Sequence, residues 1–322
     1  MRTYRGMIAT ALLMLCAAPA FADALQAKLD ALAQRAQPAH LGVTVIDLHS
    51  GQTWRVGAGR AYPMMSVFKA PLGAALLARV DRGELSLDRS VTITRADLRQ
   101  GVSPIAKHFQ GESMTFTVRQ LLKAAVGDSD NTAADALLPL VGGPAGLTNW
   151  LREQGIQGMR VDRGEGGISH DVMGLDAHNQ PPPGETDAQA DARIRRGFLA
   201  YMRGPRDTST PDAAAIFLRK LWRGELLSAS STRLLLDTMT HTPPLRIESG
   251  LPKGVQFAHK GGTSATFEGI TAAFNDIGVI SWPDGRAVVV AGFLTGSTQS
   301  AKERNALFAE LGRVVVGGVG EE

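Results

Sequence analysis

Hydrophobic residues alternate with polar or small residues at 41–45, which is the pattern of a half-buried strand, and apolar stretches recur near the C-terminus. These patterns predict strands at 41–47, 53–56, 270–274, 277–282 and 287–294. Turn residues join the first two strands at 49–52 and the last two at 283–285. Because the strands come from both ends of the chain, we predict one antiparallel five-stranded sheet assembled from both termini.

Elsewhere the apolar residues recur at helical spacing. This spacing predicts helices at 24–36, 66–82, 117–126, 131–140, 144–154, 212–222, 231–239 and 299–314. The two terminal helices flank the sheet, and the others form an all-helical lobe. We therefore predict an α/β (α+β) fold in which residues 23–60 and 235–322 form the sheet domain and residues 61–234 the helical domain. The cleft between two such domains is a common place for a small-molecule site.

The segment from 170 to 206 departs from this plan. It contains Pro181-Pro182-Pro183-Gly184, several acidic residues, and a more basic stretch at 193–202 that could form a helix. Its pattern gives no strong indication of a core, so we expect a long surface insertion. Segments of this kind are either functional or mobile.

The N-terminus has the pattern of a secretory signal peptide. Arg2 and Arg5 precede an apolar run at 7–18, and the small-residue pattern Ala20-Phe21-Ala22 follows. We predict cleavage after Ala22 and a periplasmic or secreted mature protein. The single cysteine, Cys16, lies inside this leader, so we expect a mature chain without disulfides, thiolate metal sites or a cysteine nucleophile.

The net charge and the hydropathy of the chain limit the kinds of partner that it could bind. The formal net charge is +3, and removing Arg2 and Arg5 with the leader lowers it to +1. This balance gives no electrostatic argument for binding nucleic acid or an anionic membrane. Beyond the leader, no apolar run approaches the roughly 20 residues that span a bilayer. We expect a monomer that acts on a small molecule, without a metal or other cofactor and without a membrane attachment after leader cleavage.

Three short motifs carry the candidate chemistry. Ser66-Val67-Phe68-Lys69 opens a predicted helix, and its spacing places the serine and lysine side chains on one face. A serine hydroxyl needs an adjacent base to become a nucleophile, and a helix N-terminus favours the negative charge that develops. Ser129-Asp130-Asn131 stands at a loop-to-helix junction, and Lys260-Gly261-Gly262 on the approach to a C-terminal strand. Alone, each has an ordinary reading as a helix cap or a solvated lysine.

Together and in this order, the motifs resemble the S-x-x-K, S-D-N and K-T-G signature of class A β-lactamases and penicillin-binding proteins. The resemblance covers nearly the whole mature chain. It adds Asp162-Arg163-Gly164-Glu165, which is similar to the start of the family's Ω-shaped loop, here at about 161–210. Arg163 and Asp207 resemble the ion pair that closes the neck of that loop. The resemblance implies hydrolysis of β-lactams through an acyl-enzyme.

The resemblance also implies the role of each matching residue. The catalytic residues it implies are Ser66, Lys69, Ser129 and Glu165. The substrate-binding residues it implies are Asn131, Lys260, Gly262, Thr263 and Arg246. Ser66 would be the nucleophile, and its proton would pass either to Lys69 or, through water, to Glu165. Ser129 would pass a proton to the departing nitrogen, and Glu165 would activate the hydrolytic water. The N–H groups of Ser66 and Thr263 would form an oxyanion hole.

Two positions depart from the family pattern. Gly261 replaces the hydroxyl residue that usually separates the lysine and glycine of the third motif. Unless Thr263 and Arg246 compensate, losing a bond of about 1.5 to 3 kcal/mol to the substrate carboxylate lowers kcat/KM roughly 10- to 150-fold. Ser169 stands where the family usually has an asparagine that positions the water, so we expect slower deacylation.

Two other functions remain open on the sequence alone. A penicillin-binding protein or DD-peptidase would use the same nucleophile on peptidoglycan peptides, but such proteins generally lack the carboxylate at Glu165 and stay acylated. A non-catalytic β-lactam-binding sensor, motivated by Gly261 and Ser169, would bind without forming a covalent adduct. We interpret His259, next to Lys260, as a strand residue and not a catalytic base.

Overall fold

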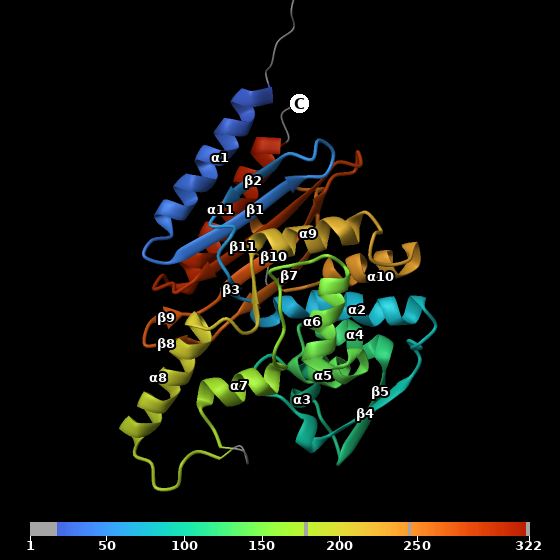
Figure 1. Cartoon of the computed structure of the whole chain (residues 1–322), viewed down its shortest axis with the longest axis vertical. Coiled ribbons are helices and arrows are strands. Elements are labelled where there is room, and N and C mark those ends of the chain that lie inside the picture. The colour runs from blue at the N-terminus through green and yellow to red at the C-terminus, as the bar shows by residue number, and fades with distance from the viewer. Residues whose placement is uncertain (1–17, 177–179, 244–245, 320–322) are drawn as a thin grey trace, which may run out of the picture.

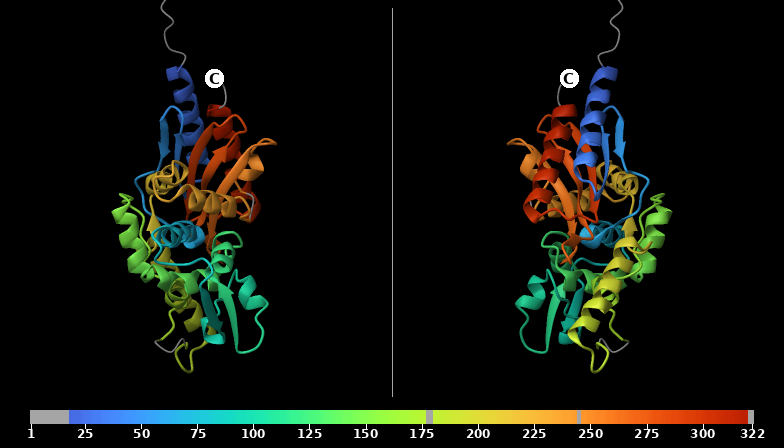
Figure 2. Two further views of the ribbon diagram at one scale, coloured as in Figure 1. Left: turned by 90° about the vertical axis from the view of Figure 1, so that its right-hand side faces the viewer. Right: turned by 90° about the vertical axis from the view of Figure 1, so that its left-hand side faces the viewer.

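The computed structural model describes residues 18–176, 180–243 and 246–319 of the chain (Figure 1). The predicted leader therefore lies largely outside the described residues, and the described chain begins with helix α1 (Ala18–Arg35). A sheet covered by helices forms one end of the molecule, and a group of helices forms the other (Figure 2).

A five-stranded antiparallel sheet is built from both ends of the chain. Its strands are β1 (His40–Asp47), β2 (Thr53–Val56), β7 (Gln256–Thr263), β10 (Phe274–Ser281) and β11 (Ala287–Thr295). They lie in the order β2-β1-β11-β10-β7, so the N-terminal hairpin joins the C-terminal strands through β1 and β11. The predicted fold class is confirmed.

One predicted strand was wrong. Residues 270–274 do not form a strand of the main sheet, because β9 (Ile270–Thr271) pairs with β8 (Thr266–Phe267) in a separate hairpin. The edge strand of the sheet is β7, so Lys260-Gly261-Gly262 lies within a strand and not before one. Residues 257–262 are all buried, but they include His259, Lys260 and two glycines, so neither alternation nor a continuous apolar run marks this strand.

Helices cover both faces of the sheet (Figures 1 and 2). Helices α1 and α11 (Ala301–Val319) pack together on one face, where Phe274 and Phe308 meet edge to face with ring centroids 5.0 Å apart. Helix α9 (Pro211–Trp222) crosses the other face against β1 and β11. The sheet is thus the rigid layer from which β7 reaches the helical lobe.

Helix α2 (Lys69–Asp81) is the central helix of the lobe, and every residue from Lys69 to Ala78 is buried. The predicted helix at 66–82 begins as the 3₁₀ turn η1 (Met65–Phe68). Around it lie α3 (Pro104–Lys107), α4 (Val118–Val126), α5 (Asn131–Leu137), α6 (Gly143–Glu153) and α10 (Ala229–Met239). Shorter elements are β3 (Tyr62–Pro63), β6 (Thr208–Ser209), η2 (Arg95–Asp97), η3 (Leu138–Val141) and η4 (Glu248–Gly250).

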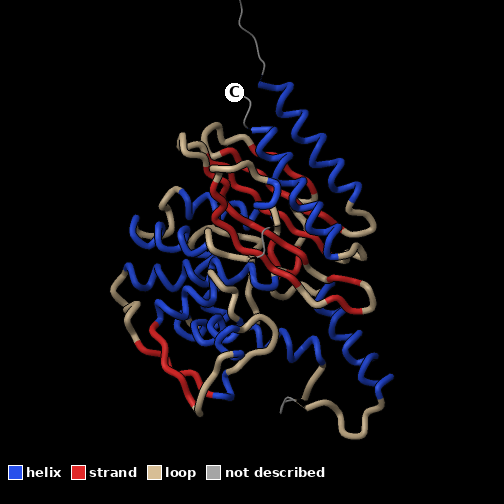
Figure 3. Tube along the Cα trace, turned by 180° about the vertical axis from the view of Figure 1, so that it is seen from behind, coloured by secondary structure: helices blue, strands red, loops and turns tan. Residues whose placement is uncertain are grey.

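The region between the terminal strands is not wholly helical. Strands β4 (Ser90–Thr94) and β5 (Ser113–Thr117) form a hairpin at the edge of the helical lobe, away from the main sheet (Figure 3). Both strands alternate serine or threonine with apolar residues, a short pattern that the sequence reasoning missed; Ile93 is the single buried residue of the hairpin. In the part of the chain that the structure describes, no helix is both long and apolar enough to cross a bilayer.

The predicted insertion at 170–206 is more ordered than its sequence indicates. It contains the end of α7 (Glu165–Met173) and the whole of α8 (Asp187–Arg203), which begins with a capping box between Thr186 and Gln189. Phe198 and Tyr201 of α8 are buried in a small cluster with residues of α7 and of the β8–β9 region. The possible helix at 193–202 is thus part of α8, and the few buried residues of this segment have partners in distant parts of the chain.

Candidate active site

The candidate nucleophile Ser66 lies in the turn η1, where the chain enters α2. The preceding residue, Met65, has a φ of 46°, a conformation that is costly for a side chain of this size. The Asn275 side chain holds this turn by donating to the carbonyl oxygens of Pro63 and Met64 at 2.8 and 3.1 Å. A Cβ at Gly262 would lie only 2.4 Å from the Met64 oxygen. Gly262 is therefore required for β7 to approach the nucleophile.

One carboxylate oxygen contacts both the serine and the lysine of the first motif. Ser66 Oγ donates to Glu165 Oε1 at 3.2 Å, and Lys69 Nζ lies 2.9 Å from the same oxygen. Lys69 also donates to the Ser129 carbonyl at 2.8 Å and to Asn131 Oδ1 at 2.6 Å. The fully buried ammonium thus has an acceptor for each of its three protons. The arrangement places the Glu165 carboxylate beside both the Lys69 side chain and the Ser66 hydroxyl.

The second and third motifs meet at the hydroxyl of Ser129. Lys260 Nζ donates to Ser129 Oγ at 2.9 Å and to the Gly261 carbonyl at 2.9 Å. Burial lowers the pKa of Lys260 well below its usual range, and the positive charges of Lys69 and Arg246 lower it further. An ammonium of this kind releases a proton readily, and Ser129 stands where it can pass that proton on.

The loop that carries Ser129 is held in place by the next residue, Asp130, which is fully buried. Its Oδ1 caps α5 by accepting the Ala133 N–H at 2.8 Å, and its Oδ2 accepts the Ile105 N–H at 2.7 Å. Ser129 itself has a φ of 59°, so the loop is held in a strained conformation at the residue that faces Lys260.

Asp135, which the sequence reasoning missed, positions Glu165. Its two carboxylate oxygens accept the N–H groups of Glu165 at 2.7 Å and of Gly166 at 2.9 Å, and Arg99 pairs with it at 2.6 Å. Asp135 lies in α5 and Glu165 is the first residue of α7. This contact therefore fixes the start of α7, and with it the Glu165 side chain, against the helix that begins at Asn131. No local pattern marks Asp135, because its partners lie thirty residues away in the chain.

The expected ion pair at the neck of the Ω-shaped loop is present. Arg163 Nε lies 2.6 Å from Asp207 Oδ2, and Asp207 Oδ1 accepts the N–H groups of Asp162 and Arg163 at 2.7 and 2.8 Å. The side chains of Arg163 and Asp207 are only 10% and 4% exposed, so solvent screens this pair less than an exposed one. The two ends of the loop that carries Glu165 are therefore held together by this ion pair and these hydrogen bonds.

The candidate substrate-binding residues form a second group on and beside β7. Arg246 is buried, and its guanidinium donates to Thr263 Oγ1 and to the Asn275 carbonyl. Thr263 is exposed at the end of β7. Asn131 belongs to the first group, because its Nδ2 donates to the Gln100 carbonyl at 2.8 Å while its Oδ1 contacts Lys69. Ser169 is exposed on α7, one turn after Glu165, outside both groups.

Comparisons with known proteins agree with this geometry. Residues 24–319 match the model of the β-lactamase enzyme family. The chain belongs to this family. The extended-spectrum β-lactamase PER-1 of Pseudomonas aeruginosa is 36% identical over 253 residues, which are 78% of this chain and 73% of that protein.

Solved β-lactamase structures have the same fold. A β-lactamase from Chitinophaga pinensis matches with a TM-score of 0.77 at 29% identity, over 90% of this chain and 97% of that one. An ancestral class A β-lactamase, described as the last common ancestor of Gram-negative bacteria, matches with a TM-score of 0.73 at 38% identity, over 91% and 99%. The resemblance to class A β-lactamases is thereby confirmed.

Within this β-lactamase-family chain, His259 is a buried residue of β7. Its Nδ1 lies 2.7 Å from Asp276 Oδ1, and its ring stacks on Phe257 with centroids 4.7 Å apart. Burial lowers the pKa of His259, but the Asp276 carboxylate more than offsets this effect, so the net shift is upward. The interpretation of His259 as a strand residue agrees with this placement.

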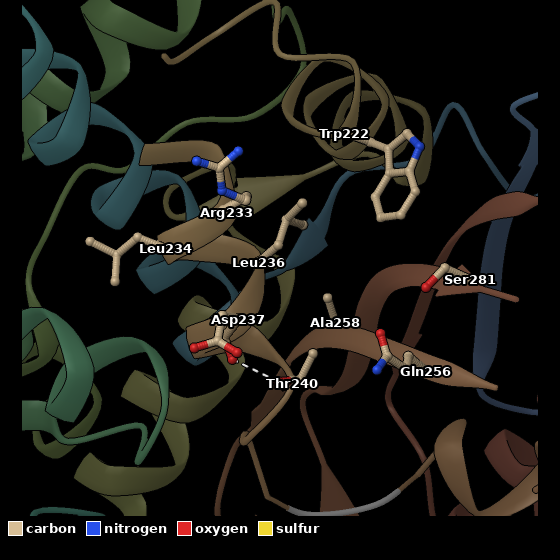
Figure 4. A pocket seen from close by; sticks show the side chains of 9 residues that line it. All are labelled: Trp222, Arg233, Leu234, Leu236, Asp237, Thr240, Gln256, Ala258 and Ser281. Carbon is tan, nitrogen blue, oxygen red and sulfur yellow. Dashed lines mark hydrogen bonds between the residues drawn. The ribbon is translucent and has the colours of Figure 1, made fainter. Parts of the chain in front are cut away.

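A pocket of about 600 Å³ lies between α10 and the sheet. Figure 4 shows Trp222 at the end of α9, Arg233 and Asp237 on α10, and Gln256 and Ser281 on the strands around it. The residues that line this pocket include none of the four candidate catalytic residues. This pocket is therefore separate from the Ser66 network.

Proposed function

We propose that this β-lactamase-family protein hydrolyses β-lactams through an ester on Ser66, which water activated by Glu165 then releases. The observation that carries the proposal is the shared contact of Glu165 Oε1 with Ser66 Oγ at 3.2 Å and with Lys69 Nζ at 2.9 Å. The similarity to PER-1, which is named an extended-spectrum β-lactamase, supports the same activity.

In the first step, Ser66 Oγ forms a bond to the lactam carbonyl carbon, and Glu165 takes the hydroxyl proton. Lys69 stays a cation and stabilises the negative charge near the serine. The oxyanion is received by the N–H groups of Ser66 and Thr263, which act as fixed donors. When the C–N bond breaks, Ser129 gives its proton to the nitrogen, and Lys260 restores the proton to Ser129 across their 2.9 Å contact.

In the second step, Glu165, after returning its proton to solvent, takes a proton from a water that attacks the ester carbon. Ser66 Oγ then leaves and takes this proton from Glu165, and Lys260 recovers its proton from solvent. The carboxylate is held for this task by Asp135, which binds the backbone at the start of α7. Ser169, one turn later on α7, would help to place the water.

The rival functions differ in what happens after the ester forms. A penicillin-binding protein gives a stoichiometric burst of nitrocefin hydrolysis and then stops, and a non-catalytic sensor gives no covalent adduct. The contact between Ser66 and Glu165 favours the hydrolase, because it places a base where the ester forms.

The proposal is tested with nitrocefin kinetics and intact-protein mass spectrometry on the mature protein beside Ser66→Ala. Steady turnover by the unmodified protein and its loss in the variant are expected. A burst that stops, or full turnover by Ser66→Ala, would overturn the proposal.

We also propose that the protein is exported and acts as a monomer in the periplasm or outside the cell. The support is the leader pattern, with Arg2 and Arg5 before the apolar run. N-terminal sequencing of the exported protein should begin at Asp23, and sedimentation should give the mass of one chain. A chain that keeps its first residues, or sediments as a dimer, would contradict this.

A further inference from the structure

Gly166 stands at a position where the helix itself would favour a larger residue. It is the second residue of α7, its φ does not lie in the left-handed region, and alanine is a better helix former than glycine. A Cβ at this position, however, would lie 2.6 Å from Arg99 Nε and 3.2 Å from Arg99 Cζ. Glycine at 166 therefore leaves room for the guanidinium of Arg99, which packs directly on the first turn of α7.

Arg99 is fixed in this space by several hydrogen bonds. Its Nε donates to Asp135 Oδ2 at 2.6 Å, and its Nη1 donates to the carbonyl oxygens of Ala96 and Leu98, each at 3.2 Å. Its backbone N–H donates to Thr132 Oγ1 at 2.9 Å. Because Thr132 and Asp135 both belong to α5, the guanidinium is held against this helix and cannot easily move aside.

Asp135 joins this guanidinium to the backbone that carries the candidate general base. Its Oδ2 accepts both Arg99 Nε and, at 2.9 Å, the Gly166 N–H, while its Oδ1 accepts the Glu165 N–H at 2.7 Å. The Asp135 side chain is only 11% exposed, so removing the cation would leave a largely buried charge without its ionic partner. Arg99 thus acts on Glu165 in two ways, because it orients Asp135 and also covers the backbone at Gly166.

We propose that Arg99 is a positioning residue for the hydrolytic step and is matched to the glycine at 166. Its guanidinium holds the first turn of α7 against α5 and so keeps the Glu165 carboxylate at its 3.2 Å contact with Ser66 Oγ. This inference rests on the proposed β-lactam hydrolysis. A general base must stay within reach of the water, and a displacement of about 1 Å can cost on the order of 100-fold in rate. Acylation should depend less on Arg99, because Lys69, the other candidate base, belongs to α2.

A double-mutant cycle on Arg99→Ala and Gly166→Ala tests this role. Acylation by benzylpenicillin and release of the bound drug are timed separately for each protein by rapid-quench mixing and intact-protein mass spectrometry. Each single variant should slow release about 10- to 100-fold, and acylation by much less. Once Arg99 is removed, the added methyl group has room, so Gly166→Ala should cause no further loss in the double variant. The Gly166→Ala substitution should likewise lower Tm only when Arg99 is present.

Two control variants match these substitutions. Gly317→Ala makes the same change at an exposed helical glycine that has no neighbouring atom within 4 Å. Arg95→Ala removes a nearby arginine whose ion pair with Glu112 is exposed. Both controls should leave the rates of acylation and release unchanged. Arg99→Lys keeps a cation beside Asp135 but loses the planar group, so its release rate should lie between those of Arg99→Ala and the unmodified protein; this variant covers the case in which Arg99→Ala fails to fold.

The outcomes separate this inference from the proposed function. If the unmodified protein turns over and Arg99→Ala releases the drug just as fast, the inference is refuted and the hydrolase stands. The same conclusion follows if the effects of the two substitutions are additive, or if the variants slow acylation and release equally, as a purely structural defect would. If the unmodified protein is acylated and never releases the drug, the proposed hydrolysis fails, and the positioning role of Arg99 fails with it.

Discussion

Replacing Glu165 by glutamine should separate formation of the ester from its hydrolysis. Glutamine keeps the shape of the side chain and one acceptor oxygen for Ser66 Oγ and Lys69 Nζ, which now lie 3.2 and 2.9 Å from Oε1. It removes the negative charge that would accept a proton from water. Lys69, the other candidate base for Ser66, remains in place in this variant. Acylation should therefore continue while deacylation fails.

The size of the effect follows from the two things the carboxylate provides. Losing a positioned general base slows a proton transfer about 10²- to 10⁴-fold, so the ester should persist correspondingly longer. Removing one partner of a buried ion pair costs about 3 to 5 kcal/mol. Because Lys69 is fully buried and the Glu165 side chain only 6% exposed, Tm should also fall, by roughly 6 to 12 °C for a loss of about 3 kcal/mol.

Intact-protein mass spectrometry after mixing with benzylpenicillin measures this directly. Glu165→Gln should carry one bound drug per chain for far longer than the unmodified protein. Glu112→Gln is the matched control, because Glu112 is 90% exposed and only borders Arg95 at 3.4 Å. If Glu165→Gln releases the drug as fast as the unmodified protein, another group activates the water and the reasoning is wrong.

Three further changes test the supports of the site. Asp135→Ala leaves the N–H groups of Glu165 and Gly166 without their acceptor; it should cost about 1 to 3 kcal/mol of stability and slow deacylation more than acylation, which stopped-flow kinetics would resolve. An unchanged deacylation rate would contradict this role. Tyr201→Phe removes the hydroxyl that accepts the Met65 N–H at 3.3 Å; kcat should fall a few-fold with KM nearly constant, and an unchanged kcat would show that α8 does not influence the nucleophile. The pKa of Lys260 lies well below its ordinary 10.5, so Lys260 loses its proton as the pH rises toward 10.5. The decline of kcat/KM that this loss causes should therefore begin well below pH 10.5. Lys260→Arg should move this decline upward, and an alkaline limb that stays in place would assign it to another group.

Local patterns along the chain were sufficient to predict much of the fold. The alternation in β1 and β2, the apolar stretches of β10 and β11 and the helical spacing of α2, α4, α6 and α9 come from neighbouring residues that share one environment, so each can be detected in a short window. The candidate catalytic residues Ser66 and Lys69 were predictable for the same reason, because one helical turn brings them together. Glu165 could be proposed only through the resemblance.

Tertiary structure alone decided the rest. Strand β7 could not be predicted because its buried residues include His259, Lys260 and two glycines. The burial of Phe198 and Tyr201 in α8 could not be predicted because their partners lie on α7 and near the β8–β9 hairpin. The contact of Asp135 with Glu165 and the filling of the space at Gly166 by Arg99 join residues far apart in the chain. Such contacts impose no period on the sequence, since each depends on where two separate segments happen to meet once the chain has folded.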